Sequence, residues 1–373
     1  MTDAAQLPDP RRWPARGADI PLLRLALASE AGDPAAQQRL LLELQHCVEQ
    51  GRDEDILGAL RAAPTPVAYA NLWQRICAAA DPQQDDGGAI VARLFAIPVV
   101  LVAGAKSRTV VSGVIPDIAE ITALLEQHGA IGATRNFGLS NAAASLQTLE
   151  RITPGQAYRW AHDFMRTGAP RAIAADPIEV APGREQVHLR FLVGAGIGAA
   201  VAPSFVETAS HIGTWGVPLT RLLSRQLAQP GLDLLALPRP PAPLLKAAHI
   251  GRCAQLELAF SLFVSNTVRT MRSTTGDPTA IVSAHCDAAG LAELRISMST
   301  ALDDTVLEGF RWPLHPLDEF QRIVGSITAL LEECRIGDVR LIGSIVADDE
   351  SSGRSPFIRA ADFDRAECDA LPH

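Results

Sequence analysis

The alternation of apolar and polar positions predicts both strands and helices in this chain. Leu294, Ile296 and Met298 alternate with polar residues, which is the period of a strand with one buried face. Residues 244–272 instead carry apolar residues at helical spacing over a long stretch, which predicts a long central helix. The two periods recur in turn along the chain, so we expect an α+β fold.

One helical pattern occurs more than once. The letters ITALLE begin at Ile121 and again at Ile327, and a glycine and an arginine follow both copies in nearly the same order. A weaker third copy begins at Leu219. These expected helix starts are about a hundred residues apart, so we expect one structural unit used three times.

The repeated unit extends backwards from each helix to a strand that carries an arginine. Arg93, Arg190 and Arg295 stand 28, 29 and 32 residues before the three expected helix starts. Turn-like segments at 182–185 and 287–290 separate paired strand-like runs. The unit we expect is therefore strand, strand, helix, strand, with helices on one face of a mainly antiparallel sheet and a ferredoxin-like topology as one possibility.

The order of these patterns divides the chain into six parts. In the helical segment, Asp33 and Thr65 each precede a proline, as a capping residue does at the start of a helix. We expect a flexible arm over 1–19, a helical segment over 20–82, repeat one with connecting helices over 89–176, repeat two with the long helix over 177–276, repeat three over 277–347 and a polar tail over 348–373.

Composition narrows the kinds of partner. The net charge is -9 and the basic residues are spread singly, which disfavours nucleic acid. No stretch has the length and apolar content of a membrane span or a signal peptide, so we expect a soluble protein that does not bind membranes. The six cysteines lack zinc spacing, which favours free thiols in a reducing cytoplasm. Only Lys106 and Lys246 are lysines among 33 basic residues, which suggests a bacterial source.

Sequence motifs support no catalytic residue, no cofactor and no metal. Gly194, Gly196 and Ala199 match the dinucleotide-binding turn, but the first acidic residue, Glu207, follows too soon to bind a ribose. The segment Gly104 to Ser107 resembles the end of a P-loop but lacks its first glycine. His285 and Cys286 are adjacent on a strand and point to opposite faces, so they cannot share a site.

Aromatic and cationic residues instead suggest a binding surface. Two of the five tryptophans, Trp215 and Trp312, fall in segments that we expect to be equivalent loops, and arginine and tryptophan are typical of binding sites. Both could equally cover an edge of the core. The candidate binding residues are Arg190, Arg295, His188, Trp215, Arg311 and Trp312.

The function expected from these features is binding or assembly without catalysis. In this hypothesis the repeats present loops to a protein partner, to a second copy of the chain or to a small anionic ligand. The alternative is an enzyme that acts on a small anionic substrate between repeats, with contributions from Arg190, Arg295, His188, His285 and Glu293. Convergence of these polar groups on one concave pocket would favour the enzyme.

Overall fold

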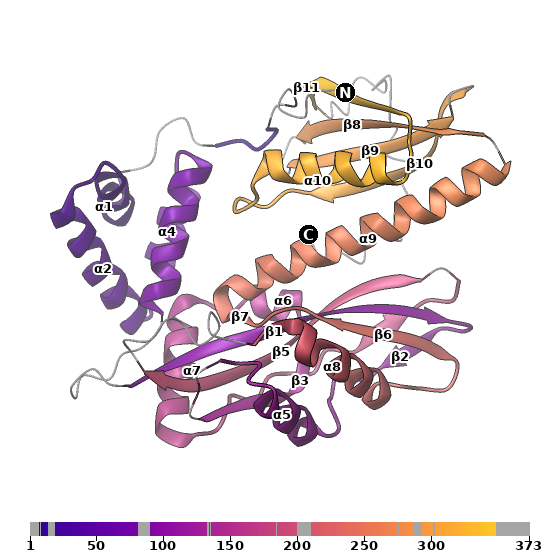
Figure 1. Cartoon of the computed structure of the whole chain (residues 1–373). Coiled ribbons are helices and arrows are strands. Elements are labelled where there is room, and N and C mark those ends of the chain that lie inside the picture. The colour runs from indigo at the N-terminus through magenta and orange to yellow at the C-terminus, as the bar shows by residue number, and fades with distance from the viewer. Residues whose placement is uncertain are drawn as a thin grey trace. The chain divides into compact units, whose positions relative to one another are not determined.

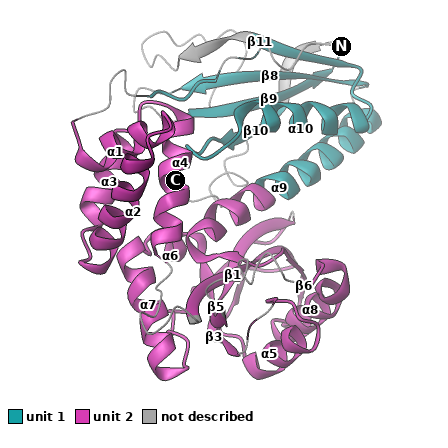
Figure 2. Ribbon diagram, turned by 60° about the vertical axis from the view of Figure 1, so that its left-hand side comes forward, with its two compact units in different colours: residues 1–14, 256–373 teal, residues 15–255 magenta. Residues whose placement is uncertain are grey.

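A computed structural model of the chain shows an α+β protein (Figure 1). The chain divides into two compact units, unit 1 with residues 1–14 and 256–373 and unit 2 with residues 15–255 (Figure 2). Among the helices that the structure describes, none has the length and apolar composition of a membrane span. The structure describes residues 7, 9–13, 19–80, 90–132, 134, 136–183, 185–199, 210–274, 276–286, 292–300 and 303–347, without the side chains of 90, 199, 303–307 and 343–347.

Unit 2 opens with four helices that share a core of leucine, isoleucine and alanine side chains. The Asp33 carboxylate accepts hydrogen bonds from the first turn of the second helix, and the Thr65 hydroxyl does the same for the fourth. Both predicted helix starts are thereby confirmed. These helices are α1 (Pro21–Glu30), α2 (Pro34–Glu49), α3 (Asp53–Arg61) and α4 (Pro66–Ala79).

The rest of unit 2 is built on an antiparallel sheet with two helical crossovers. Strand order is β3-β5-β1-β6, and every neighbouring pair on this path is antiparallel. Read along the chain, this is the β-α-β-β-α-β order of a ferredoxin-like unit, in which the strands of the two βαβ halves intercalate. Its elements are β1 (Ile90–Ala105), α5 (Ile118–Gln127), β3 (Asn136–Ser145), β5 (Gln186–Ala199), α8 (Ile212–Gln226) and β6 (Leu232–Pro238).

The two faces of this sheet pack against different helices. Phe95, Ile97 and Val99 alternate along β1 and share a core cluster with Trp215 and with apolar residues of α5, and Figure 1 shows α5 and α8 on this face. On the other face, Gly251 of helix α9 (Leu244–Thr274) lies against the Phe191 ring, where an added Cβ would be 2.7 Å from a ring carbon. The sheet is therefore covered by helices on both sides.

A proline interrupts the outer pairing of β1. Strand β6 pairs with β1 over Val99–Ala105, and the short β7 (Ala242–Pro243) pairs with Phe95 and Ala96. Pro98 lies between these two stretches, where its oxygen accepts a hydrogen bond from Arg239 N at 2.7 Å, and it faces Phe191 of β5 in the register. Because proline has no N–H to donate, this gap is where a central strand can hold one.

Shorter elements connect the helical segment of unit 2 with its antiparallel sheet. The Asp53 carboxylate at the start of α3 accepts hydrogen bonds from Thr153 Oγ1 at 2.7 Å and from Gly155 N at 2.9 Å, which joins the helical segment to α7. Thr153 and Gln156 also form a capping box on α7. The connecting elements are β2 (Thr109–Val111), which pairs with β4 (Ile178–Val180), and the helices α6 (Leu146–Glu150) and α7 (Pro154–Thr167).

Unit 1 is a four-stranded sheet covered on one face by helices. Strand order is β10-β9-β8-β11, and β11 runs parallel to β8 while the other pairs are antiparallel. Leu294, Ile296 and Met298 of β9 are buried in one cluster with residues of α10 and of the second part of α9, as the apolar positions predicted. The polar residues Arg295, Ser297 and Ser299 on the other face are also buried, so the expectation of a single buried face is wrong. The elements are β8 (Pro278–Cys286), β9 (Ala292–Thr300), β10 (Asp303–Pro313), α10 (Phe320–Glu333) and β11 (Asp338–Ala347).

The three-fold repeat is not confirmed. Strand β11 pairs directly with β8, whereas β3 is separated from β1 by β5. Three strands precede α10, so the third unit also differs in its order of elements. The shared letters have a local explanation, because Ile121 and Leu125 form the buried face of α5, and Ile327 and Leu331 are buried four residues apart on α10. The letters specify an amphipathic helix and leave the strand order open.

The second helix of the expected repeat begins earlier than the sequence suggested. Helix α8 starts at Ile212, seven residues before Leu219, and Pro218 lies inside it. An interior proline removes its own N–H bond and crowds the carbonyl of residue i−4, and burial of the apolar side of the helix, with Trp215 and Leu219, outweighs that cost. The even spacing of arginines before the helices was therefore counted from a wrong start.

The described part of the N-terminal arm is packed, which corrects the expectation of a flexible arm at these residues. Leu7 is buried in the core of unit 1. The Arg11 guanidinium donates to the backbone oxygens of His315 and Asp318, both at 2.8 Å, and pairs with Asp9. The polar tail expected over 348–373 lies outside the described residues.

The packing of α10 on its sheet can be tested by truncating one buried leucine. Leu331 is fully buried, so Leu331→Ala should lower the free energy of unfolding by about 2 to 5 kcal/mol. Ala329 is exposed on the same helix, and Ala329→Ser should change it by less than about 0.5 kcal/mol. Urea unfolding followed by circular dichroism measures both. A loss below about 1 kcal/mol for Leu331→Ala would contradict this packing.

Candidate functional site

A solvent-open groove runs between α5 and α8 on the helical face of unit 2. Its volume is about 560 Å³. The residues that line it recur every three or four positions along each helix, so each helix contributes one continuous stripe. The lining residues are Glu120, Ala123, Leu124, Gln127 and His128 from α5 and its C-terminal end, and Pro218, Arg221, Leu222 and Arg225 from α8.

The floor of the groove is apolar and one of its ends is closed by an ion pair. Leu124 and Leu222 contribute the floor, and both also contact the core below. The Arg225 guanidinium donates to both Glu120 oxygens, at 2.6 and 2.7 Å. Both partners are largely exposed, so the pair adds little to stability and mainly fixes the position of the two side chains.

A second arginine, Arg221, lies on the rim. Its side chain is exposed and makes no hydrogen bond or ion pair with any residue that the structure describes. The rim therefore carries two guanidinium groups against one carboxylate, on a chain with a net charge of -9. A cation beside an apolar floor suits a ligand that is both anionic and apolar.

Of the candidate residues on β5, Arg190 is hydrogen-bonded inside unit 2, whereas the buried His188 Nε2 has no hydrogen-bond partner among the described residues. Arg190 donates from Nη1 to the Leu189 oxygen at 2.8 Å and from Nη2 to the Pro177 oxygen at 3.1 Å. His188 lies two residues away on the same face, and burial, followed by repulsion from Arg190, lowers the pKa of His188 to about 4. Arg190 thus holds backbone in place, and His188 is neutral at physiological pH.

Near these two residues, Asp176 fastens the segment before β4 to α6. Its Oδ2 accepts hydrogen bonds from Thr148 Oγ1 at 2.7 Å and from Ser145 N at 3.1 Å. Burial raises the pKa of Asp176, but these hydrogen bonds and the positive charge of Arg190 outweigh that effect and lower it overall. The carboxylate is accordingly ionised and used structurally.

The candidate arginines of unit 1 form an ion cluster around Glu293, in which Arg295 is buried and Arg311 is partly exposed. Arg295 donates from Nε to Glu293 Oε1 at 2.6 Å, and Arg311 donates from Nε to Glu293 Oε2 at 2.8 Å. The Arg295 side chain is only 4 % exposed. On the neighbouring strand, Ser283 Oγ and His285 Nε2 are 2.8 Å apart. The expectation that Arg295 reaches a ligand from a solvated strand face is therefore wrong, because its charge is neutralised inside the protein.

Both tryptophans lie in regular elements of the core, which corrects their placement in binding loops. Trp215 is in the first turns of α8, and its Nε1 donates to the Ser210 oxygen at 3.2 Å. Trp312 is in β10 and is buried, with its ring 6.1 Å from that of Phe260. A tryptophan beside glycine or proline resembles a loop in sequence, but here burial of the indole determines the structure.

The nucleotide-like motifs have structural explanations. Gly194 and Gly196 lie within β5, where no turn exists. A Cβ at Gly194 would be 2.6 Å from both the Gly138 oxygen and the Phe95 ring, so the close approach of neighbours requires glycine there. Lys106 and Ser107 occupy the turn after β1. Neither motif forms a phosphate-binding loop.

The polar residues expected for an enzyme are divided between the units, with His188 and Arg190 in unit 2 and Glu293, Arg295 and His285 in unit 1. Comparison of the chain with protein-family models, with curated proteins and with solved structures found no match.

The groove was missed by sequence reasoning. Its only signal was the spacing of Arg221 and Arg225, four residues apart on a predicted helix.

The ion cluster of unit 1 predicts a large cost for removing one arginine. Arg295→Met leaves Glu293 buried with one cation fewer, so the free energy of unfolding should fall by about 3 kcal/mol. Arg340 pairs with Asp338 on the same sheet, but both are exposed, and Arg340→Met should cost less than about 1 kcal/mol. Chemical denaturation of the two variants and of the wild type measures these free energies of unfolding. Equal losses would show that the cluster is not desolvated.

The lowered pKa of His188 predicts an acid-sensitive fold. The unfolded chain protonates this imidazole near pH 6.5, but the folded chain does so only near pH 4, so stability falls as the pH drops through that window. Between pH 7 and pH 5 the loss attributable to His188 should be about 2 kcal/mol. His188→Leu should lack this part of the loss, whereas a variant of the exposed His162, His162→Leu, should keep it. Urea titrations at both pH values decide; identical pH dependence in wild type and His188→Leu would exclude the assignment.

Proposed function

We propose that the chain is a non-enzymatic binding protein whose groove between α5 and α8 receives an acidic amphipathic helix of a protein partner. The observation that carries the proposal is the exposed Arg221 side chain, unpaired among the described residues, beside the apolar floor of Leu124 and Leu222. A helix with apolar residues on one side and carboxylates along its edge would bury the floor and pair with this guanidinium.

The shape of the groove favours a helix over a small molecule. Pockets for small ligands enclose most of the ligand surface. This groove is open to solvent, and its walls are the parallel stripes of two helices. A helix laid along it would anchor through residues spaced three or four apart, which matches the spacing of the stripes.

Composition supports a bacterial cytoplasm as the place of this binding. Lysine is nearly absent among the basic residues, with 2 of 33, and the six cysteines do not form the spacing pattern of a disulfide framework. The negative net charge keeps the chain soluble, and outside the groove it disfavours acidic partners. An acidic helix would therefore be directed to the rim that carries the arginines.

Site-specific photo-crosslinking in the cells of origin tests the proposal. A photoreactive phenylalanine analogue replaces Ala123, which lines the groove, or Ala329, which is exposed on α10 of unit 1 and does not line the groove. We expect a discrete protein adduct from position 123 and none from position 329. Arg221→Glu should reduce the adduct about tenfold, which corresponds to about 1.4 kcal/mol of binding free energy.

Mass spectrometry of the adduct identifies the crosslinked segment. An acidic helical segment supports the proposal. No adduct at 123, the same adducts at both positions, or an adduct unaffected by Arg221→Glu would overturn it. Circular dichroism of each variant confirms that the fold is retained, which is expected because all three side chains are exposed.

A further inference from the structure

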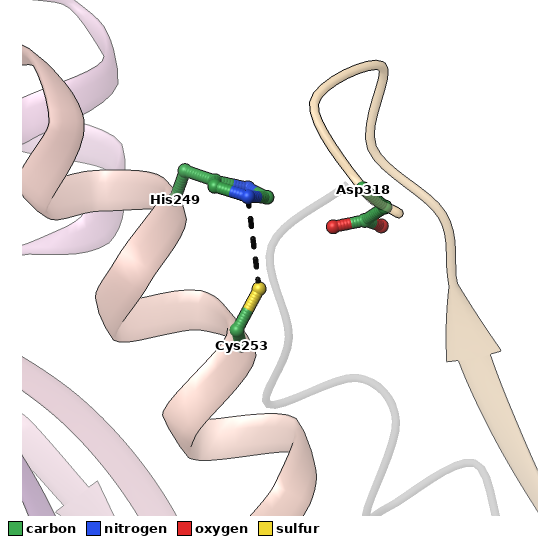
Figure 3. Close-up of side chains that lie close together, drawn as sticks. All are labelled: His249, Cys253 and Asp318. Atoms are coloured by element: carbon green, nitrogen blue, oxygen red, sulfur yellow. Dashed lines mark hydrogen bonds between the residues drawn. The ribbon is translucent and has the colours of Figure 1, made fainter. Parts of the chain in front are cut away.

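Helix α9 carries a histidine and a cysteine one turn apart. His249 and Cys253 are four residues apart, so they project from the same side of the helix (Figure 3). His249 Nε2 lies 3.9 Å from Cys253 Sγ, and both side chains are partly buried. Both belong to unit 2. Figure 3 also draws Asp318 of unit 1, whose Oδ2 accepts a hydrogen bond from the His315 backbone N at 2.7 Å.

The separation of the two atoms fits a shared metal ion. A tetrahedral Zn²⁺ binds thiolate at about 2.3 Å and imidazole nitrogen at about 2.0 Å, which places the two ligand atoms about 3.5 Å apart. The observed 3.9 Å differs from this by about 0.4 Å, which a small side-chain rotation supplies. Thiolate and imidazole are also the ligands that zinc prefers over harder cations.

The backbone beneath the pair is held firmly. Gly251, midway between the two residues, packs against Phe191 and Leu189 of β5. At 100° per residue, His249 and Cys253 therefore project from the side of α9 that faces away from this sheet. A ligand pair on a helix fixed in this way needs little reorganisation to bind a cation.

We propose that His249 and Cys253 together bind a thiophilic divalent cation such as Zn²⁺. The imidazole binds as the neutral base through Nε2, and the Cys253 thiol loses its proton to water on binding, so affinity rises with pH. The pair supplies two ligands, and water completes the coordination, so the ion is exchangeable and binds more weakly than in a closed four-ligand site.

Cobalt titration of the full chain tests this inference. Co²⁺ bound to a thiolate absorbs through a ligand-to-metal charge-transfer band in the near ultraviolet, and Zn²⁺ should displace Co²⁺ and bleach that band. We expect Cys253→Ser to abolish the band. His249→Gln should weaken Co²⁺ binding at least about tenfold, because even the loss of a group that supports a metal ligand costs about that much affinity. Cys334 is also partly exposed, and Cys334→Ser should leave the titration unchanged.

Alkylation of the unmodified chain gives a second readout that needs no variant. Zn²⁺ should slow the reaction of Cys253 with iodoacetamide several-fold while Cys334 reacts at the same rate, as peptide mapping would show. A band that persists in Cys253→Ser, a wild type without a thiolate-cobalt band, or a Cys253 alkylation rate unaffected by Zn²⁺ would overturn the proposal. Photo-crosslinking in the α5/α8 groove is independent of these outcomes, because no groove residue is a proposed ligand.

Discussion

The antiparallel pairing of β1 with β5 is the constraint on which unit 2 depends. It joins the two βαβ halves at the centre of the sheet, with β3 added outside β5 and β6 outside β1. Each half therefore completes its sheet only with a strand from the other half. The pairing also sets the positions of α5 and α8, because both pack on the face to which Phe95 and Ile97 point. The groove between these helices is thus a product of the central pairing, although none of its lining residues lies on a strand.

Charged side chains in this protein fall into two groups with different physical roles. Arg190, Arg295 and Glu293 are largely removed from water, and burial of a charge is tolerated only with close partners. Their partners are backbone oxygens or each other, although the buried Arg190 Nε has no hydrogen-bond partner among the described residues. Arg221 is in contact with water and retains the capacity to bind a ligand. A recurring arginine in sequence therefore does not reveal its role until its burial is known.

Local features of the sequence predicted local structure well. The α+β class, the long helix from Leu244 and the capped starts at Pro34 and Pro66 were all readable, because periodicity and capping act within a few residues. Strand order was not readable. It depends on pairs such as Ile97 with Leu192, and the letters repeated in α5 and α10 specify a buried helix face without specifying neighbours. For the same reason the groove, which needs two helices brought side by side, lay beyond sequence reasoning.

The central position of β1 has a consequence for synthesis on the ribosome. Ile97 and its partner Leu192 are 95 residues apart (192 − 97), so at about 5 to 20 residues per second β1 waits for roughly 5 to 20 seconds before β5 emerges. During that time its sixteen residues, which include a single charge at Arg93, are an apolar strand without a partner. Pro98 interrupts this strand at its middle and cannot donate to a foreign ladder. The residue between the β6 and β7 ladders of the finished sheet therefore also removes one donor that the nascent strand could offer to another chain.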